Sequence, residues 1–333
     1  MRFDFLVYAP RSGSTWFARL LAASTQEVLV VPELRLPELL HAWGDERVRA
    51  FDAAERLRLL EEDFQIQNLG LDETLLQRVM AESAGNGIRA TLETVIGTYA
   101  RQRGFAGERA LIKLGALVLL APKVKKIFPE ARFVHIYRDP RAAVSSMIRT
   151  ERPYYPGQRM ARGDALYAAG AWRRVMSAVT ENVDAADLVE VRFEDLVDRP
   201  AAETRRVLTA LAVPHAAEAG GLQFQVGAAE QAIHGNIDGE ARADRVDAWK
   251  DALTWWQGVA IEWRCRDRMH SAGYEPWYRA RYGWLRRATA VAYASLRYGL
   301  AALRYRWWEL FPRAGSARRS RSAWMLAMQR RLR

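Results

Sequence analysis

The sequence predicts an α/β fold in which a mostly parallel central sheet lies between two layers of helices. Two observations support this prediction. Short apolar runs with the character of buried strands alternate along the chain with segments whose apolar residues recur at helical spacing. Turns containing Gly, Pro, Ser or Asp separate several of these strands from the helices that follow. Because ligands of parallel sheets bind at the carboxyl ends of the strands, polar residues in these turns are the first candidates for a functional site.

The expected elements follow in order from the N-terminus. Residues 3–9 form a buried strand and residues 15–23 the helix after it, with Pro10 and Gly13 in the turn between them. Segments rich in Leu, Glu and Arg from 37 to 100 predict several helices. Later strands are expected at 110–113, 133–137 and 188–193, and later helices at 123–127, 140–147, 165–179 and 200–211.

The composition is that of a globular enzyme. Of the 333 residues, 50% are hydrophobic and 27% are charged. The single cysteine, Cys265, cannot form an internal disulfide, which fits a reducing compartment. The sequence shows no secretory signal, and no uncharged run approaches the roughly 20 residues needed to cross a bilayer. We therefore expect a cytoplasmic protein.

The net charge of +11 is concentrated near the C-terminus. Residues 279–333 contain 14 arginines and one acidic residue, whereas residues 1–278 contain 36 basic and 38 acidic side chains. We therefore divide the chain into a domain at 1–278, with a helical insert at about 32–103, and a basic helical tail at 279–333. A nucleic-acid partner is not expected, because no nucleic-acid-binding fold accompanies the charge.

The tail predicts an amphipathic helix from Trp284 to Phe311. On a helical wheel Arg286, Arg297 and Arg304 lie together, and most of the large apolar residues gather on the other side. Arginine mixed with Trp and Tyr in this way is typical of helices that bind an anionic membrane surface, here the inner face of the membrane. The alternative is a terminal helix that packs on the body of the protein or on a second copy.

The segment at 10–16 has the features of an anion-binding loop. It joins a strand to the start of a helix, where free backbone N–H groups and the helix dipole attract negative charge. Its glycine allows close approach of the backbone, its arginine adds charge, and its hydroxyls add donors. It is not a Walker A loop, because the earlier glycine and the lysine of that motif are absent. The candidate residues are Arg11, Ser12, Gly13, Ser14, Thr15 and Trp16.

A second strand-to-helix turn, at 138–146, offers another phosphate site. Arg138 leaves the tip of the strand, and Ser146 follows two helical turns later. A guanidinium and a hydroxyl in this arrangement suit one phosphate group. Taken alone, each of the two segments would also fit an ordinary helix start, either a capped turn or a surface ion pair.

Together, the two segments resemble the donor-binding loops of sulfotransferases that use 3′-phosphoadenosine 5′-phosphosulfate (PAPS). The resemblance covers about the first 278 residues and continues in the segments RFEDLVDRP at 192–200, RVDAWK at 245–250 and AGYEP at 272–276. The pattern is similar to that of tyrosylprotein and carbohydrate sulfotransferases. It implies a P-loop-like three-layer fold, PAPS as the co-substrate, adenosine 3′,5′-bisphosphate as its product, and no metal.

The resemblance also implies which residues bind the donor. In that family the first loop holds the 5′-phosphosulfate. An arginine and a serine eight positions later, here Arg138 and Ser146, hold the 3′-phosphate. Arg245 and Lys250 are further candidates for contacts with the 3′-phosphate. Phe193 stands where the family usually has tyrosine.

Two cations are implied as catalytic residues. Sulfuryl transfer is an in-line displacement, so the protein must position both partners and stabilise charge on the transferring group. Arg11 replaces the lysine of many members and would be an electrostatic stabiliser, because a guanidinium hardly gives up a proton. Lys113 matches a family lysine that contacts the sulfuryl group. The Thr-Pro or Asp-Pro that usually follows this lysine is Leu114-Gly115 here.

Glu33 is our candidate for the base that takes the proton of the acceptor. It lies 22 residues after Arg11 and resembles the Glu-x-Arg element of the tyrosylprotein enzymes, in which the glutamate is the base. Apolar neighbours would raise its affinity for protons. His41 is the competing candidate, because some members use histidine. We expect His135 to be a core residue and His234 to lie in a loop that closes over the donor.

The predicted function is transfer of a sulfuryl group from PAPS to a hydroxyl of a glycan, glycolipid or secondary metabolite, with the insert on the acceptor side. A nucleoside or small-molecule kinase is disfavoured, because the Walker lysine and an evident Mg²⁺ carboxylate are missing. A non-catalytic membrane adaptor is disfavoured by the joint presence of Arg11, Lys113, Arg138 and Ser146. Neither the acceptor nor the oligomeric state can be read from the sequence.

Overall fold

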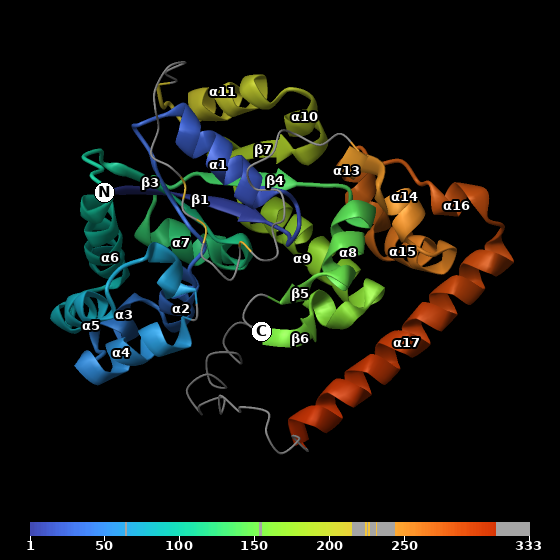
Figure 1. The fold of residues 1–333 in the computed structure, drawn as a ribbon, viewed down its shortest axis with the longest axis horizontal. Helices are drawn as coiled ribbons and strands as arrows, with labels where there is room; N and C mark the ends of the chain where they lie inside the picture. The colour runs from blue at the N-terminus through green and yellow to red at the C-terminus, as the bar shows by residue number, and fades with distance from the viewer. Residues whose placement is uncertain are drawn as a thin grey trace.

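A five-stranded sheet with the order β2-β3-β1-β4-β7 forms the centre of the computed structural model (Figure 1). Every neighbouring pair in this sheet is parallel, as predicted. Its strands are β1 (Arg2–Tyr8), β2 (Leu29–Val31), β3 (Arg109–Lys113), β4 (Phe133–Tyr137) and β7 (Leu188–Arg192). The structure describes residues 1–63, 65–152, 155–214, 224, 226, 231 and 244–310, without the side chains of 155–157 and 304–310.

The sheet is buried on both faces, which explains the apolar character of its strands. In β1, Phe3, Phe5 and Val7 belong to one apolar cluster, while the alternate residues Leu6 and Tyr8 belong to another. Successive side chains of a strand point to opposite faces, so helices must cover both.

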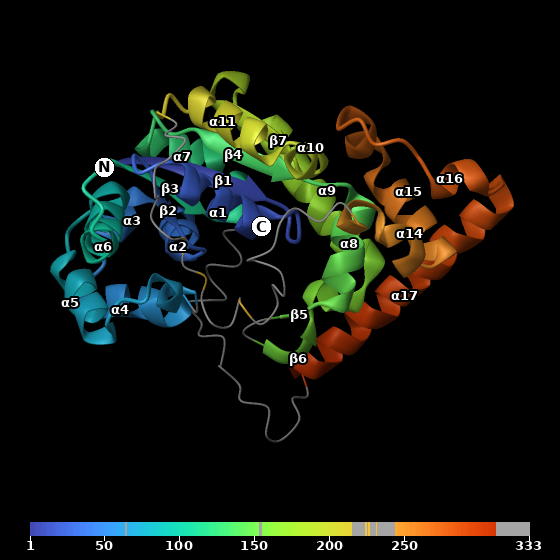
Figure 2. The same cartoon turned by 45° about the horizontal axis from the view of Figure 1, so that its top comes forward.

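The covering helices form two layers (Figure 2). Apolar residues of one layer join the cluster of Leu6; its helices are α1 (Ser14–Ser24), α10 (Phe193–Asp198) and α11 (Pro200–Ala210). Apolar residues of the other layer join the cluster of Phe5; its helices are η2 (Gly115–Leu120), α7 (Ala121–Ile127), α8 (Pro140–Arg149) and α9 (Ala165–Asn182). The three-layer prediction is therefore confirmed, with boundaries within a few residues of those expected.

The predicted insert is helical and packs beside β2 (Figure 2). Its elements are α2 (Leu36–Trp43), α3 (Asp45–Arg49), α4 (Ala53–Glu62), η1 (Ile66–Leu69), α5 (Glu73–Glu82) and α6 (Ile88–Gln102). The buried side chain of Arg56 donates hydrogen bonds to three backbone carbonyls and two hydroxyls of neighbouring segments. These bonds tie the insert together around one guanidinium.

The remaining described elements lie beyond α8. They are η3 (Met160–Gly163), η4 (Ala185–Asp187), the hairpin of β5 (Glu151–Arg152) and β6 (Tyr155–Arg159), α13 (Asp244–Asp247), α14 (Trp249–Ala252), α15 (Trp255–Ser271), α16 (Tyr278–Arg281) and α17 (Trp284–Leu310). The predicted tail helix is thus present as α17, and it packs along α15 with Ala290 and Ala294 buried. The boundary between 278 and 279 stays a prediction, and His234 lies outside the described residues.

None of the described helices is sufficiently long and apolar to pass through a membrane.

A buried ion network joins α8 to α15. Arg141 in α8 pairs with Glu262 at 2.9 Å and with Asp139 at 2.6 Å, and its guanidinium lies over the ring of Trp249. The carboxylate of Glu262, only 1% exposed, also accepts three backbone N–H groups from residues 277–279. Helix α8, which carries Ser146, is therefore anchored to the C-terminal helices.

Removing one partner of this network should destabilise the fold strongly. We predict that Glu262→Gln lowers the free energy of unfolding by about 3 kcal/mol, because it leaves Arg141 buried with less compensation. Glu181→Gln is the matched control. Glu181 in α9 pairs with Arg268, which lies in α15 as Glu262 does, but the Glu181 side chain is 63% exposed. That change should cost less than about 0.5 kcal/mol. Urea unfolding measures both, and equal losses would contradict the assigned role of the network.

Candidate functional site

Four predicted site residues lie at or just beyond the carboxyl ends of four neighbouring strands. Glu33 follows β2, Lys113 ends β3, Arg11 follows β1, and Arg138 follows β4. Neighbouring strands of a sheet are about 5 Å apart. The order β2-β3-β1-β4 therefore brings these residues to one edge of the sheet, in the order Glu33, Lys113, Arg11, Arg138.

Gly13 allows the first loop to pack against the end of β7. Its φ of 87° lies in the left-handed region, and it caps the helix α1. A Cβ atom at this position would lie only 2.4 Å from the ring of Phe193. The ring of Trp16 also meets Phe193 edge-on, with ring centroids 6.3 Å apart. The segment at 192–200, which contains Phe193, therefore packs against this loop.

The hydroxyl residues of the loop are buried at the start of α1. Ser12, Ser14 and Thr15 are each at most 6% exposed. The hydroxyl of Ser12 is buried and has no hydrogen-bond partner among the described residues. A buried polar group without a partner costs about 1–3 kcal/mol, so its presence requires an explanation. Its position beside a helix N-terminus is one at which an anion would complete the hydrogen bonding.

Arg11 joins the two predicted loops. Its Nε donates a 3.0 Å hydrogen bond to the hydroxyl of Ser146, and its carbonyl accepts from Nη1 of Arg138 at 3.5 Å. The φ of Arg11 is 68°, a conformation that a residue with a side chain rarely adopts and that costs about 1–3 kcal/mol. The contacts with α8 and Arg138 support this strained turn.

Guanidinium groups concentrate positive charge at this point. Burial, with the charges of Arg138 and Arg245, lowers the pKa of Arg11 to about 10. Burial also lowers the pKa of Arg138, although Glu194 and Asp139 act in the opposite direction. A multiply charged anion at this point would offset the repulsion between the guanidinium groups.

The backbone at Arg138 and Asp139 is held by Trp172 and by residues of the segments at 192–200 and 272–276. Its carbonyl accepts a 3.0 Å hydrogen bond from the indole of Trp172. Glu194 accepts from the backbone N–H of Asp139 at 3.0 Å and from the hydroxyl of Tyr274 at 2.8 Å. The segments at 192–200 and 272–276 therefore meet at the start of α8.

Arg245 and Lys250 are placed differently. The carbonyl of Arg245 accepts a 2.6 Å hydrogen bond from Nη2 of Arg138, so α13 contacts the cluster. The ammonium group of Lys250 pairs with Asp247 at 2.7 Å and lies over the ring of Trp277. Arg245 is therefore better placed than Lys250 for the predicted contact with the 3′-phosphate.

Glu33, Lys113 and Tyr8 form a second polar cluster at the same edge. Nζ of Lys113 and the hydroxyl of Tyr8 both donate to Oε2 of Glu33 at 2.7 Å. Tyr8 is the last residue of β1, three positions before Arg11. Its carbonyl lies so close to Gly115 that a Cβ atom there would approach it within 2.4 Å. Glycine at position 115, where the family usually has proline, therefore permits the chain after β3 to pass close to the end of β1.

The expected rise in the proton affinity of Glu33 is wrong. Burial alone would raise the pKa of Glu33, but the charge of Lys113 and hydrogen bonds from Lys113, Tyr8 and Gln65 hold it below its ordinary value. The carboxylate is therefore ionised at neutral pH, with a cation on one of its oxygens. The apolar neighbours were considered in the sequence analysis, whereas the contact with Lys113 was not.

The insert holds the loop that carries Glu33. Asn68 donates a 2.7 Å hydrogen bond to the carbonyl of Glu33, and the carboxylate of Asp63 accepts from the backbone N–H of Leu36 at 2.7 Å. Asp63 also accepts from the N–H of Gln65, whose side chain bonds to Glu33. The insert thereby fixes both the backbone and the carboxylate of Glu33.

The two histidines considered above are both buried. His41 in α2 is 1% exposed, bonds to the carbonyl of Pro37 through Nδ1, and has its pKa lowered to about 4 by burial. His135 is fully buried in β4, as expected of a core residue. Burial of His41 favours Glu33, with its 26% exposed side chain, as the group that an acceptor can reach.

The sequence analysis did not include Tyr8 or Phe193 among the candidate site residues. Tyr8 could have been identified from its position, because it is the last residue of the strand that precedes the anion-binding loop. Phe193 was noted only as a replacement for tyrosine, and its contacts with Gly13 and Arg138 depend on how β7 and β4 pair. Within the described part of the chain, no group of three His, Cys, Asp or Glu residues could hold a metal ion.

A sequence profile described as the sulfotransferase family matches residues 5–217 of the chain. No curated protein matches the chain significantly. The sulfotransferase domain of the Synechococcus PCC 7002 olefin synthase is 19% identical, with a TM-score of 0.56 over 83% of this chain and 95% of that structure. The sulfotransferase domain from the curacin biosynthetic pathway is 14% identical, with a TM-score of 0.54 over 83% of this chain and 99% of that structure. These two structures share the fold described here.

Asp63 should make the stability of the protein depend on pH. Burial raises its pKa to about 6, above the value of about 3.9 expected in the unfolded chain. The folded state then binds the proton more tightly, so the free energy of unfolding falls as the pH rises between these values, by about 3 kcal/mol. We predict that Asp63→Asn removes this contribution.

Urea unfolding of both proteins from pH 4 to pH 7 measures the effect. Over this pH range the difference in unfolding free energy between wild type and variant should change by about 2 kcal/mol, because all other titrations, including that of His41, occur in both proteins. A difference that does not vary with pH would contradict the assignment.

Proposed function

The chain belongs to the sulfotransferase family, and we propose that it transfers a sulfuryl group from PAPS to an acceptor hydroxyl. The observation that carries the donor assignment is the meeting of the two loops through Arg11, Arg138 and Ser146 beside α8. The start of α1 and, beside it, the guanidinium of Arg138 with the hydroxyl of Ser146 suit a ligand with two separate phosphate groups. ATP with Mg²⁺, the donor of the alternative kinase, has no 3′-phosphate for Arg138 and Ser146.

The donor contacts follow from the positions of these residues. The backbone N–H groups at the start of α1, with Ser12, Ser14 and Thr15, would hold the 5′-phosphosulfate. Arg138 and Ser146, with Arg245 beside them, would hold the 3′-phosphate. Trp16 and Phe193 form the apolar wall next to Gly13. Arg11 contacts both parts and would neutralise charge on the leaving phosphate.

In the reaction, the acceptor oxygen attacks sulfur while the bond from sulfur to the phosphate oxygen breaks. The acceptor proton passes to the carboxylate of Glu33, and adenosine 3′,5′-bisphosphate leaves. Lys113 would stabilise the negative charge on the oxygens of the sulfuryl group. No metal ion is needed in this scheme, because Lys113 and Arg11 supply the positive charge.

The ion pair between Lys113 and Glu33 has a role in this scheme. While Lys113 is paired with Glu33, the pKa of the carboxylate is held low. When a sulfuryl group draws the ammonium charge toward itself, Glu33 loses part of this stabilisation and becomes a stronger base. Glu33 would thus gain basicity only once a donor is present.

The acceptor is proposed to be a hydroxyl of a glycan, glycolipid or secondary metabolite. It would approach from the side of the insert, because the segment from Asp63 to Asn68 holds Glu33 there. We also propose that the enzyme is cytoplasmic and associates peripherally with the inner face of a membrane. This proposal is supported by α17, on which several large apolar side chains are exposed.

Calorimetry with adenosine 3′,5′-bisphosphate tests the donor assignment. We predict that the bisphosphate binds to the full chain and that ATP–Mg²⁺ binds at least tenfold more weakly, because it lacks the 3′-phosphate. Arg138→Ala should weaken binding of the bisphosphate by about tenfold or more, since charged hydrogen bonds contribute about 1.5–3 kcal/mol. The exposed Arg205→Ala on α11 is the control and should bind normally. Tight binding of ATP–Mg²⁺ with none of the bisphosphate would contradict the proposal.

Replacement of the base should separate catalysis from donor binding. We predict that Glu33→Gln lowers sulfate transfer by about 10²–10⁴-fold, because no carboxylate then accepts the proton. Binding of the bisphosphate should change little. Transfer can be followed with labelled donor and a panel of hydroxyl acceptors. Full activity of Glu33→Gln would remove Glu33 as the base, and a matched His41→Gln variant would then show whether the histidine takes its place.

A further inference from the structure

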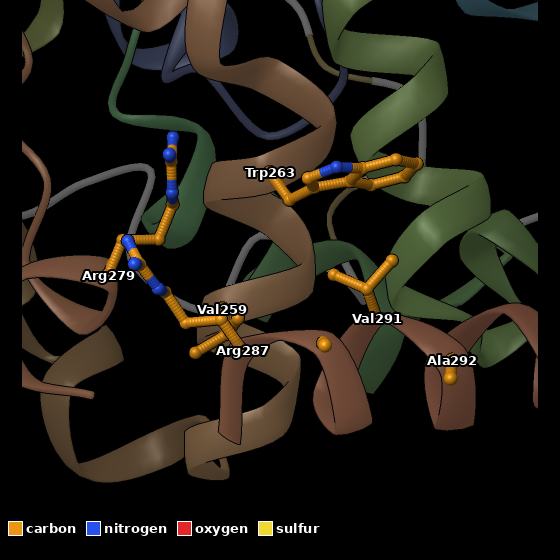
Figure 3. A pocket seen from close by; sticks show the side chains of 7 residues that line it. Val259, Trp263, Arg279, Arg287, Val291 and Ala292 are labelled. Atoms are coloured by element: carbon orange, nitrogen blue, oxygen red, sulfur yellow. The ribbon is translucent and has the colours of Figure 1, made fainter. Parts of the chain in front are cut away.

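A pocket of about 510 Å³ opens between α15, α16 and α17 (Figure 3), and none of the four residues at the sheet edge lines it. Its walls combine apolar side chains with two arginines. Arg279 comes from α16 and Arg287 from α17, and Val259 and Trp263 come from α15. Apolar lining with arginines is suited to an amphiphile that has an anionic head.

The two arginines are available to a ligand. Within the described part of the chain, neither the Arg279 nor the Arg287 guanidinium forms an ion pair or a side-chain hydrogen bond. The nearby carboxylate of Glu262 contacts Arg279 through its backbone N–H and not through its guanidinium, and it forms its ion pair with Arg141. Residues 276–303, which include α16 and most of α17, contain five arginines and no acidic residue.

The outward face of α17 is apolar and lies next to this pocket. Leu285, Leu296, Leu300 and Leu303 are 58–66% exposed. They fall within about 60° of one another on the helical wheel and extend over about 27 Å along the axis. In Figures 1 and 2, α17 runs along the outer edge of the molecule, and no other described element covers its far side. The pocket residues Ala288 and Ala292 border this row of leucines.

We propose that this pocket binds the phosphate headgroup of an anionic phospholipid, while the leucines of α17 enter the apolar layer of the same membrane. The inference rests on the proposed peripheral membrane association and assigns it a specific site. Arg279 and Arg287 would hold the headgroup, and Trp263 would lie at the boundary between headgroups and acyl chains. The leucine face and the arginines would thus engage the same lipid surface.

The charges favour a membrane over a second copy of the chain. Two copies that met through the leucines of α17 would bring Arg286 and Arg297 of each helix toward those of the other. An anionic surface instead offers opposite charge to every arginine of the segment.

Vesicle sedimentation tests the proposal with the full chain. We expect binding to vesicles of equal parts phosphatidylcholine and phosphatidylglycerol, and weak binding to phosphatidylcholine alone. Arg279→Gln/Arg287→Gln should bind the anionic vesicles about 25-fold more weakly, from roughly fivefold for each arginine near the surface. Arg279→Lys/Arg287→Lys should retain most of the binding. Leu296→Gln/Leu300→Gln should lose it on both kinds of vesicle.

The controls separate this site from the donor site and from other occupants. Arg205→Gln, on α11 at the top of the molecule in Figure 1 and away from α17, should bind vesicles normally. All variants should bind adenosine 3′,5′-bisphosphate as the wild type does, which shows that they are folded. Undiminished vesicle binding by Arg279→Gln/Arg287→Gln would overturn the headgroup site alone. A stable dimer by light scattering that dissociates in Leu296→Gln/Leu300→Gln, or phosphate binding without vesicle binding, would overturn the membrane assignment.

Discussion

The parallel pairing of β1 with β3 and β4 is the constraint on which the site depends. This pairing places the end of β1 between Lys113 and Arg138, and it brings Tyr8 beside Gly115. The edge pairing of β2 with β3 then adds Glu33 next to Lys113. The residues come from distant parts of the chain, and only the strand order brings them together.

The edge of the sheet is divided into two electrostatic regions. At one end, burial and the nearby charges of Arg138 and Arg245 lower the pKa of Arg11 to about 10, which favours a strongly anionic ligand. At the other end, the Glu33–Lys113 pair is internally neutral and holds a carboxylate in its ionised form. The division suits a reaction in which one end binds phosphates and the other receives a proton.

Much of the fold was predictable because its signals are local. Apolar runs such as Phe133–Tyr137 identify strands directly, and residues such as Pro140 identify the first turns of helices. The structure confirms both of these elements. The three-residue strand β2 was not predicted, because a run so short carries no period of its own. The Arg11–Ser146 contact could be anticipated from the two loops, whereas the lowered pKa of Glu33 depends on the pairing of β2 with β3, which sequence spacing does not show.

A crystal structure of the full chain with adenosine 3′,5′-bisphosphate tests the central claim most directly. The account predicts the 3′-phosphate in contact with Arg138 and Ser146, and the 5′-phosphate on the backbone N–H groups between Gly13 and Thr15. The 5′-phosphate should lie on the side that faces Lys113 and Glu33. A bisphosphate bound elsewhere, or one whose 5′-phosphate points away from Lys113, would contradict the account.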